Sequence, residues 1–176
     1  MALATVADVV PLTGLNRAFV RQGLAVMAER RRGGLAALIE ASGLAGAIQP
    51  WHLGFALGPR INAGGRIGDA SLGARLLVEK DEASARRIAA ELDSLNKARQ
   101  EIEKLAVEEG IAQASRFIER RPDAALVLAA SSEWHPGVVG LVAARLKERF
   151  GRPAFALALD AAGHATGSGR SIAGVD

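Results

Sequence analysis

DEASARRIAAELDSLNKARQEIEKLAVEEGIAQASRF, residues 81–117, is the stretch that decides the architecture. Its apolar side chains recur at spacings of four, three, seven and three, which places them on one stripe of a helix. Asp81 can cap the N-terminus with its carboxylate, and Gly110 is where the helix could be interrupted or end. At a rise of about 1.5 Å per residue, residues 81–109 alone form a helix about 40 Å long. The stripe consists of Ile88, Leu92, Leu95, Ile102 and Leu105, and three pairs of opposite charge support the helix: Asp93 with Lys97, Arg99 with Glu103, and Lys104 with Glu108.

A helix of this length with so narrow an apolar stripe cannot be enclosed by one small core. We therefore predict that residues 79–121 form a long connecting helix between two compact units, residues 1–78 and residues 122–176. The fold class expected for the whole chain is α/β.

The composition is that of a soluble globular protein, with 49% apolar and 23% charged residues in a chain of 176. No run of 18 or more apolar residues occurs, and the N-terminus lacks the basic region of a secretory signal, so we expect no membrane association. The absence of cysteine excludes disulfides and thiolate metal sites and is typical of cytoplasmic proteins. The formal net charge is +3, and residues 1–78 carry the surplus, eight Lys or Arg against four Asp or Glu.

Residues 3–12, LATVADVVPL, are apolar and β-branched apart from Thr5 and Asp8, which predicts a buried strand ending near Pro11. A carboxylate in so apolar a run must be hydrogen-bonded, paired or bound to metal, because burying it alone would cost several kcal/mol. Asp8 is therefore a candidate metal ligand or catalytic residue, and the alternative is a helix-capping or turn carboxylate.

Two short helices are expected before the middle of the chain, one starting at Thr13 or Asn16 and one at residues 35–44, with Gly33 and Gly34 as the stop between them. Residues 50–52 are expected to form a turn.

The next segment, GPRINAGGRIGDA at residues 58–70, is rich in glycine and is expected to be a loop followed by a helix from about Asp69. It lacks the Gly-Lys-Ser/Thr ending of a P-loop. Arg60, Asn62 and Arg66 could grip a phosphate or a carboxylate there. A structural crossing of two backbones and a ligand-facing loop are equally compatible with this composition.

After the long helix, the pattern predicts a strand at residues 124–130, a helix at 137–150 and a strand at 154–159, which together form a right-handed parallel unit. Ligands of such sheets gather at the carboxyl ends of strands, so His135 lies at a suitable edge beside a helix N-terminus. The alternative for His135 is a hydrogen-bonded turn residue.

The last segment, GHATGSGRSIAG at residues 163–174, concentrates small and hydroxyl residues around one arginine. Ser168, Arg170 and Ser171 could deliver hydroxyls, backbone N–H groups and a guanidinium to one phosphate. A glycine-rich hairpin with an exposed arginine is the alternative.

Four segments in order resemble one family: TVADVVPL with NRAFVRQGL, GPRINAGGRIGDA, SSEWHPGVVGLVAARLKERFGRP and GSGRSIAGVD. They are similar to segments of the RecJ exonucleases, which are bacterial single-strand-specific enzymes of the DHH phosphoesterase superfamily. The resemblance covers essentially the whole chain. It implies that residues 1–78 are the C-terminal part of a DHH metal-dependent phosphoesterase domain and that residues 122–176 are the N-terminal part of a DHHA1 nucleic-acid-binding domain.

The resemblance also implies roles for individual residues. Asp8 matches an aspartate that holds the catalytic divalent metals, Mn²⁺ or Mg²⁺. Ser168 and Arg170 match the segment that holds the 5′ end or backbone of single-stranded DNA, which would be 5′-phosphorylated. Arg60, Asn62 and Arg66 lie in a motif lining the cleft between domains, and His135 lies in a WHxGVxG signature.

The sequence departs from the family in one important respect, since no DHH triplet occurs and His52, His135 and His164 each stand alone. We therefore expect an internal fragment of a 5′-to-3′ exonuclease of DNA repair and recombination, with its remaining metal ligands upstream. A fragment with one ligand cannot assemble a two-metal site, so the chain alone should hydrolyse nothing. Two alternatives are a DHH-family phosphodiesterase acting on oligonucleotides or cyclic dinucleotides, and a non-catalytic scaffold of the same fold that binds single strands.

Overall fold

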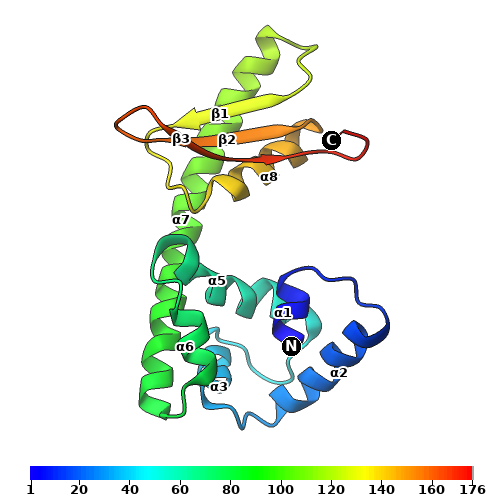
Figure 1. Ribbon diagram of the computed structural model, residues 1–176, viewed down its shortest axis with the longest axis vertical. Helices are drawn as coiled ribbons and strands as arrows, with labels where there is room; N and C mark the ends of the chain where they lie inside the picture. The colour runs from blue at the N-terminus through cyan, green and yellow to red at the C-terminus, as the bar shows by residue number, and fades with distance from the viewer. Residues whose placement is uncertain (176) are drawn as a thin grey trace. The chain divides into compact units, whose positions relative to one another are not determined.

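The computed structural model describes residues 1–175 and divides into two compact units, Met1–Lys97 and Ala98–Asp176 (Figure 1). Asp176, the last residue of the expected second unit, lies outside the described residues. The division falls within the long helix α7 (Glu82–Arg120), so each unit contains part of that helix.

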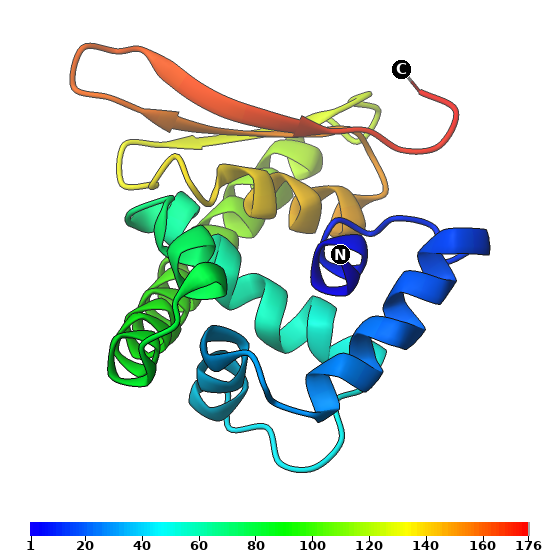
Figure 2. The same cartoon turned by 60° about the horizontal axis from the view of Figure 1, so that its bottom comes forward.

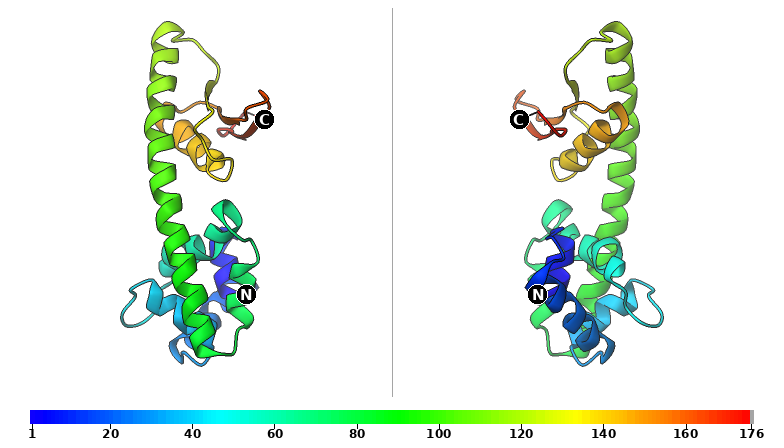
Figure 3. Two further views of the ribbon diagram at one scale, coloured as in Figure 1. Left: turned by 90° about the vertical axis from the view of Figure 1, so that its left-hand side faces the viewer. Right: turned by 90° about the vertical axis from the view of Figure 1, so that its right-hand side faces the viewer.

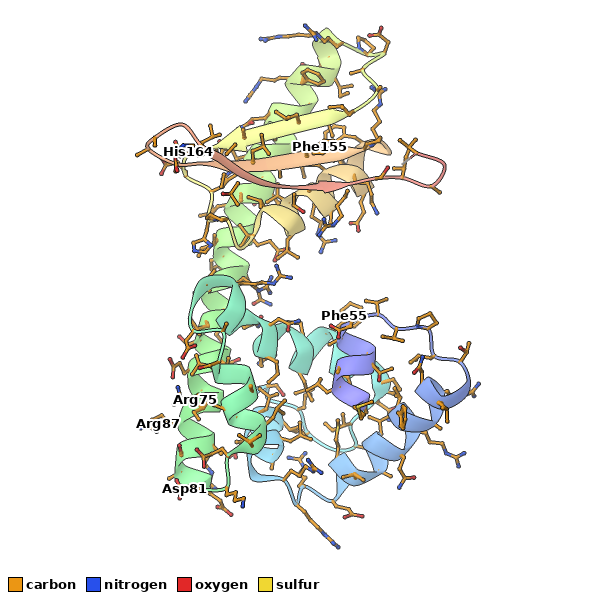
Figure 4. All side chains as sticks on the ribbon, in the orientation of Figure 1. Phe55, Arg75, Asp81, Arg87, Phe155 and His164 are labelled. Carbon is orange, nitrogen blue, oxygen red and sulfur yellow. The ribbon has the colours of Figure 1, made fainter. Side chains whose placement is uncertain are left out.

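Helix α7 confirms the predicted long helix, and its 39 residues fall just inside the expected range 79–121. Asp81, labelled in Figure 4, caps it by accepting a hydrogen bond of 2.7 Å from the Ser84 backbone N–H. Gly110 does not interrupt the helix. A Cβ at that position would lie 3.1 Å from Val142 Cγ1 and 3.3 Å from the Trp134 ring, so the glycine makes room for those side chains.

The apolar stripe of α7 was predicted correctly except at one position. Ile88 and Leu92 are buried, but Leu105 is 66% exposed and does not belong to the stripe. The buried residue beside it is Ala106. Two of the predicted charge pairs form, Asp93 with Lys97 and Arg99 with Glu103.

All regular secondary structure described in unit 1 is helical, and Figure 2 shows α1 beside α2 and α5. Before α7 its elements are α1 (Ala2–Ala7), α2 (Gly14–Ala28), α3 (Gly33–Ala41), α4 (Pro50–His52), the π-helical turn η1 (Leu53–Leu57), α5 (Gly58–Ile67) and α6 (Leu72–Val78). Helix α2 follows Thr13 as predicted, but Gly33 and Gly34 open α3 instead of stopping α2. The core is formed chiefly by Leu38, Ile39, Leu53, Leu57, Leu76 and Leu92.

The strand predicted at residues 3–12 is wrong, because this segment begins with helix α1. An apolar run this short does not distinguish a helix from a strand by periodicity, and alanine favours the helix. Packing then decides the outcome. A Cβ at Gly23 of α2 would lie only 2.3 Å from the Ala2 Cβ, so α1 sits directly against the backbone of α2.

The turn predicted at residues 50–52 and the loop predicted at 58–68 are also wrong. Pro50 starts α4, and η1 and α5 continue the helical path to Ile67. Glycine costs about 1 kcal/mol relative to alanine inside a helix, but here it permits close packing. A Cβ at Gly58 would lie 3.0 Å from the Ala7 Cβ, and one at Gly64 would lie 2.5 Å from the Asp69 carbonyl oxygen. The structural crossing is thus the alternative that the structure shows.

Unit 2 contains the predicted parallel strand–helix–strand unit, made of β1 (Val127–Ser131), α8 (Val139–Phe150) and β2 (Ala154–Leu159). Strand β3 (Ala165–Arg170) joins β2 in antiparallel orientation, so within the described residues the sheet order is β1-β2-β3. The glycine-rich hairpin expected as one alternative is therefore present. Helix α8 stops at Gly151, whose φ of 61° is left-handed.

One face of this sheet is covered by helices. Helix α8 and the C-terminal part of α7 both lie on this side of the sheet (Figure 3), and Val127, Ala129, Ala154 and Ala156 are buried beneath them. Phe155, on the middle strand (Figure 4), belongs to the opposite face and is 41% exposed. No helix among residues 1–175 has the length and apolarity that a membrane span requires.

Candidate functional site

Asp8 follows the last residue of α1 and is exposed, so the prediction of a buried carboxylate at a strand end is wrong. The turn carboxylate named as the alternative is what the structure shows. The Val10 N–H bonds to the Thr5 carbonyl at 3.0 Å, and Val9 between them has a φ of 56°. Helices that end in this way normally place glycine at the left-handed position, so a β-branched valine there is strained.

Asp8 and Asn62 both line a hollow of about 540 Å³ in unit 1. Its walls come chiefly from α1, α2 and α5, with single residues of α3 and α6, and they are largely apolar. Asp8 is the single carboxylate among the lining residues. Within residues 1–175, no three or more His, Asp or Glu side chains form a group that could hold a metal ion. Mg²⁺ and Mn²⁺ require several oxygen ligands. The residues of this chain therefore do not fit a complete divalent-metal site by themselves.

Arg60, on α5, is engaged inside unit 1. Its Nε donates a hydrogen bond of 2.8 Å to Asp93 Oδ1 on α7, and its Nη1 donates to the Ala56 carbonyl at 2.8 Å. The two paired side chains are only 15% and 13% exposed. The pair fastens α5 to the long helix, and a role of Arg60 toward nucleic acid stays a prediction.

The pKa of Asp93 reflects two opposing effects. Burial raises it, but hydrogen bonds from Lys97 and Arg60 outweigh burial and hold the pKa below its usual value of 3.8. Asp93 therefore stays ionised in the folded protein to a lower pH than a free aspartate does.

Asn62 and Arg66 lie four residues apart and so occupy one face of α5, turned away from the face of Arg60. Asn62 is exposed and Arg66 is half-buried. The predicted trio is thus divided between two faces of one helix.

In unit 2 the structure brings Ser168 and Arg170 together. They pair in register with Ala156 and Ala154, whose side chains are buried under the helices, so both lie on the helix-covered face of the sheet. Arg170 Nη1 donates hydrogen bonds of 2.7 Å to Ser168 Oγ and to the Gly169 carbonyl.

The first turn of α8 meets these two residues at Gly140. A Cβ at position 140 would lie 3.2 Å from Arg170 Nη2 and 3.4 Å from Ser168 Oγ. A guanidinium, a hydroxyl and the positive end of a helix dipole therefore converge, which is a favourable arrangement for an anion. Gly140 was not among the residues predicted from the sequence, although a small residue in WHPGVVG, one turn inside a predicted helix, was a usable signal.

Ser171 and His135 have local partners. Ser171 Oγ donates to the Val175 carbonyl at 2.6 Å, and His135 Nδ1 accepts from the Gly137 N–H at 3.0 Å. His135 is exposed in the turn before α8, which is the hydrogen-bonded alternative foreseen for it. Any contact of either residue with nucleic acid stays a prediction.

The chain matches no family model, but it has close curated relatives. It is 46% identical to the single-stranded-DNA-specific exonuclease RecJ of Dickeya dadantii over 99% of its length, and 41% identical to RecJ of Bacillus subtilis over 98%. The chain is thus similar to RecJ over nearly its whole length. It spans 31% and 22% of the length of these two relatives.

The solved structures agree with the sequence relation. RecJ of Thermus thermophilus in complex with Mg²⁺ superposes with a TM-score of 0.85 and 37% identity, covering 99% of this chain and 26% of that one. A RecJ exonuclease bound to manganese superposes with a TM-score of 0.82 and is covered over 42% of its length. The fold of mixed helices and sheet described above therefore resembles the matching part of the RecJ structures.

Proposed function

We propose that this chain is part of an exonuclease of the RecJ type, which degrades single-stranded DNA from the 5′ end in cytoplasmic DNA repair and recombination. The observation that carries the proposal is the meeting of Ser168, Arg170 and the first turn of α8, in a chain homologous to single-strand-specific exonucleases. A terminal phosphate would receive charge-assisted hydrogen bonds from Arg170 and a further one from Ser168. Contacts of this kind select a free strand end without reading bases.

Asp8 would supply one oxygen to a divalent ion whose other ligands lie outside this chain. The ion, Mn²⁺ or Mg²⁺ as in the solved relatives, would supply Lewis-acid activation of water and phosphate. The exposed carboxylate at the rim of the hollow is accessible for this role. We propose that the isolated chain hydrolyses nothing, because Asp8 is its single carboxylate at that hollow among the described residues.

A chimera tests the proposal. The matched segment of Dickeya dadantii RecJ is replaced by this chain, and nucleotide release from a 5′-phosphorylated single strand is measured with Mn²⁺. The chimera should degrade long single strands, and Asp8→Asn should lower the rate at least about 100-fold, as expected for loss of a metal ligand. Asp123→Asn, an exposed carboxylate of unit 2, is the control and should keep the rate.

Three results would contradict the proposal. Full activity of the Asp8→Asn chimera would reject the metal role. Cleavage restricted to dinucleotides or cyclic dinucleotides would favour a short-substrate phosphodiesterase, and strand binding without cleavage would favour a scaffold.

A further inference from the structure

The C-terminal end of α7 carries a second cationic surface, distant in sequence from Ser168 and Arg170. Gln113, Arg116, Phe117 and Arg120 follow the spacing of three, four and seven, so they share one face of the helix. Together with Arg121 they line a hollow of about 410 Å³. We call this surface, made of these five residues, the α7-end surface.

Hydrogen bonds hold one side of this hollow in place. The side-chain amide of Gln113 donates to the Ala130 carbonyl and accepts from the Ala130 N–H, both at 3.1 Å, which ties this face of α7 to strand β1. Arg121 places its guanidinium over the Phe117 ring, 5.8 Å from the centroid. Contacts within unit 2 thus fix the position of the α7-end surface, and the Phe117 ring and the Arg121 guanidinium are stacked at one side of it.

Its arginines are free of carboxylates. In the part of the chain that the structure describes, no ion pair involves Arg116, Arg120 or Arg121, and the same holds for exposed arginines such as Arg17 and Arg149. What distinguishes the α7-end surface is that three such arginines line one hollow. Glu119 is the carboxylate nearest in sequence, and it does not line the hollow. Attraction to the helix C-terminus explains cations in the last turn, but not Arg116, which precedes that turn, nor the hollow.

We infer that the α7-end surface binds the phosphate backbone of single-stranded DNA, as a contact additional to the one at Ser168 and Arg170. Planar guanidinium groups match phosphate geometry, and an unpaired base can stack on an aromatic ring or on a guanidinium plane. The choice of DNA as the ligand rests on the proposed function. The surface itself rests on the unpaired arginines and the hollow.

The test measures binding of a fluorescent oligothymidylate to the whole chain, with and without a 5′-phosphate, over a range of salt. The triple variant Arg116→Ala/Arg120→Ala/Arg121→Ala should lose about tenfold in affinity, equally for both oligomers. The slope of log affinity against log salt should become shallower by about two, because three phosphate contacts are lost. The matched control Arg31→Ala/Arg86→Ala/Arg145→Ala removes the same charge from ion-paired positions and should change affinity less than about twofold.

Equal weakening by both triple variants, or unchanged binding by the first, would overturn the inference. A triple Arg→Lys variant of the surface should retain the salt slope, which shows that loss in the alanine variant does not come from misfolding. Arg170→Ala should weaken only the 5′-phosphorylated oligomer, so failure of the proposed anchor is distinguished from failure of the α7-end surface. Displacement of the oligomer by an acidic peptide at stoichiometric concentration would identify an acidic protein segment as the ligand and would overturn the DNA assignment.

Discussion

The two units of this protein use glycine in different ways. In unit 1, glycines lie where helices touch backbone to backbone, and a Cβ at Gly34 would lie only 1.7 Å from the Leu76 carbonyl oxygen. In unit 2, the core under the sheet is filled by side chains such as Val142 and Leu146, which are fully buried. Glycine in unit 1 is therefore a packing surface inside helices, although the same residue predicts loops when it is considered alone.

The candidate sites differ in a parallel way. Unit 1 offers one carboxylate at the rim of a mainly apolar hollow. Unit 2 brings a hydroxyl, a guanidinium and a helix N-terminus to one place. Unit 2 is thus equipped to hold an anion, whereas unit 1 supplies a single ligand.

The largest effect is expected where the backbones of unit 1 are closest. Gly34→Ala should lower the free energy of unfolding of unit 1 by about 3 kcal/mol, because α3 and α6 must separate to admit a methyl group. Hydrogen exchange followed by mass spectrometry reports each unit separately and should show faster exchange in unit 1. The neighbouring Gly33 has its nearest atom at 4.0 Å, so Gly33→Ala should stay within about 0.5 kcal/mol of the parent. Equal effects at both positions would refute the close-packing role of glycine.

The second-largest effect on stability is expected at the ion pairs of Asp93 with Arg60 and Lys97 in unit 1. Asp93→Asn should cost about 2 kcal/mol at neutral pH, because Arg60 and Lys97 lose an ionised partner in a mostly buried place. Since the pKa of Asp93 is lowered on folding, its stabilisation is present above about pH 4 and is lost as the pH falls through the folded-state value.

Urea unfolding of the parent and of Asp93→Asn, at neutral pH and at about pH 2, measures this contribution. The difference between the two proteins should shrink at the lower pH. Glu91→Gln, an exposed carboxylate on the same helix, is the control. A difference that does not depend on pH would refute the ionic origin.

A smaller effect on stability is expected in unit 2, where the side chain of Gln113 bonds to the backbone of edge strand β1 as a neighbouring strand would. Gln113→Ala should lower the stability of unit 2 by about 1 kcal/mol, because both backbone groups of Ala130 lose their partner at the edge of β1. Fluorescence of the buried Trp134 in a Trp51→Phe background reports this unit. Gln100→Ala, exposed on the same helix, should leave the transition unchanged. An unchanged transition in Gln113→Ala would show that the strand edge needs no partner.

The smallest effect should be a gain. Val9→Gly relieves the left-handed strain at the end of α1 and should stabilise unit 1 by about 0.5 kcal/mol, because relief of strain slightly exceeds the added chain entropy of glycine. Thermal unfolding measures the shift. Val10, which has no positive φ, is the control, and Val10→Gly should destabilise. Loss of stability in Val9→Gly would show that the contacts of the valine side chain stabilise unit 1 by more than its left-handed backbone destabilises it.

Prediction from sequence succeeded best in unit 2. The segment 154–159 is a strand with the predicted bounds, and α8 and β1 lie within three residues of theirs. Turn residues such as Pro136 and Gly151 separate these elements, so the local sequence was sufficient to predict the length and type of each one. In unit 1 the short apolar run at residues 3–12 and the glycine-rich run at 58–68 were assigned to the wrong structure.

The sequence by itself determined the long helix, its cap at Asp81, the parallel strand–helix–strand unit and the RecJ resemblance, because periodicity, capping chemistry and motif order are local properties of the chain. Only the tertiary structure decided that the glycine-rich segment is helical and that Asp8 is exposed. It also decided that Gly140 lies against Ser168 and Arg170. The physical reason is that close contacts between distant segments can outweigh a local preference of about 1 kcal/mol, and no local pattern records which segments will meet.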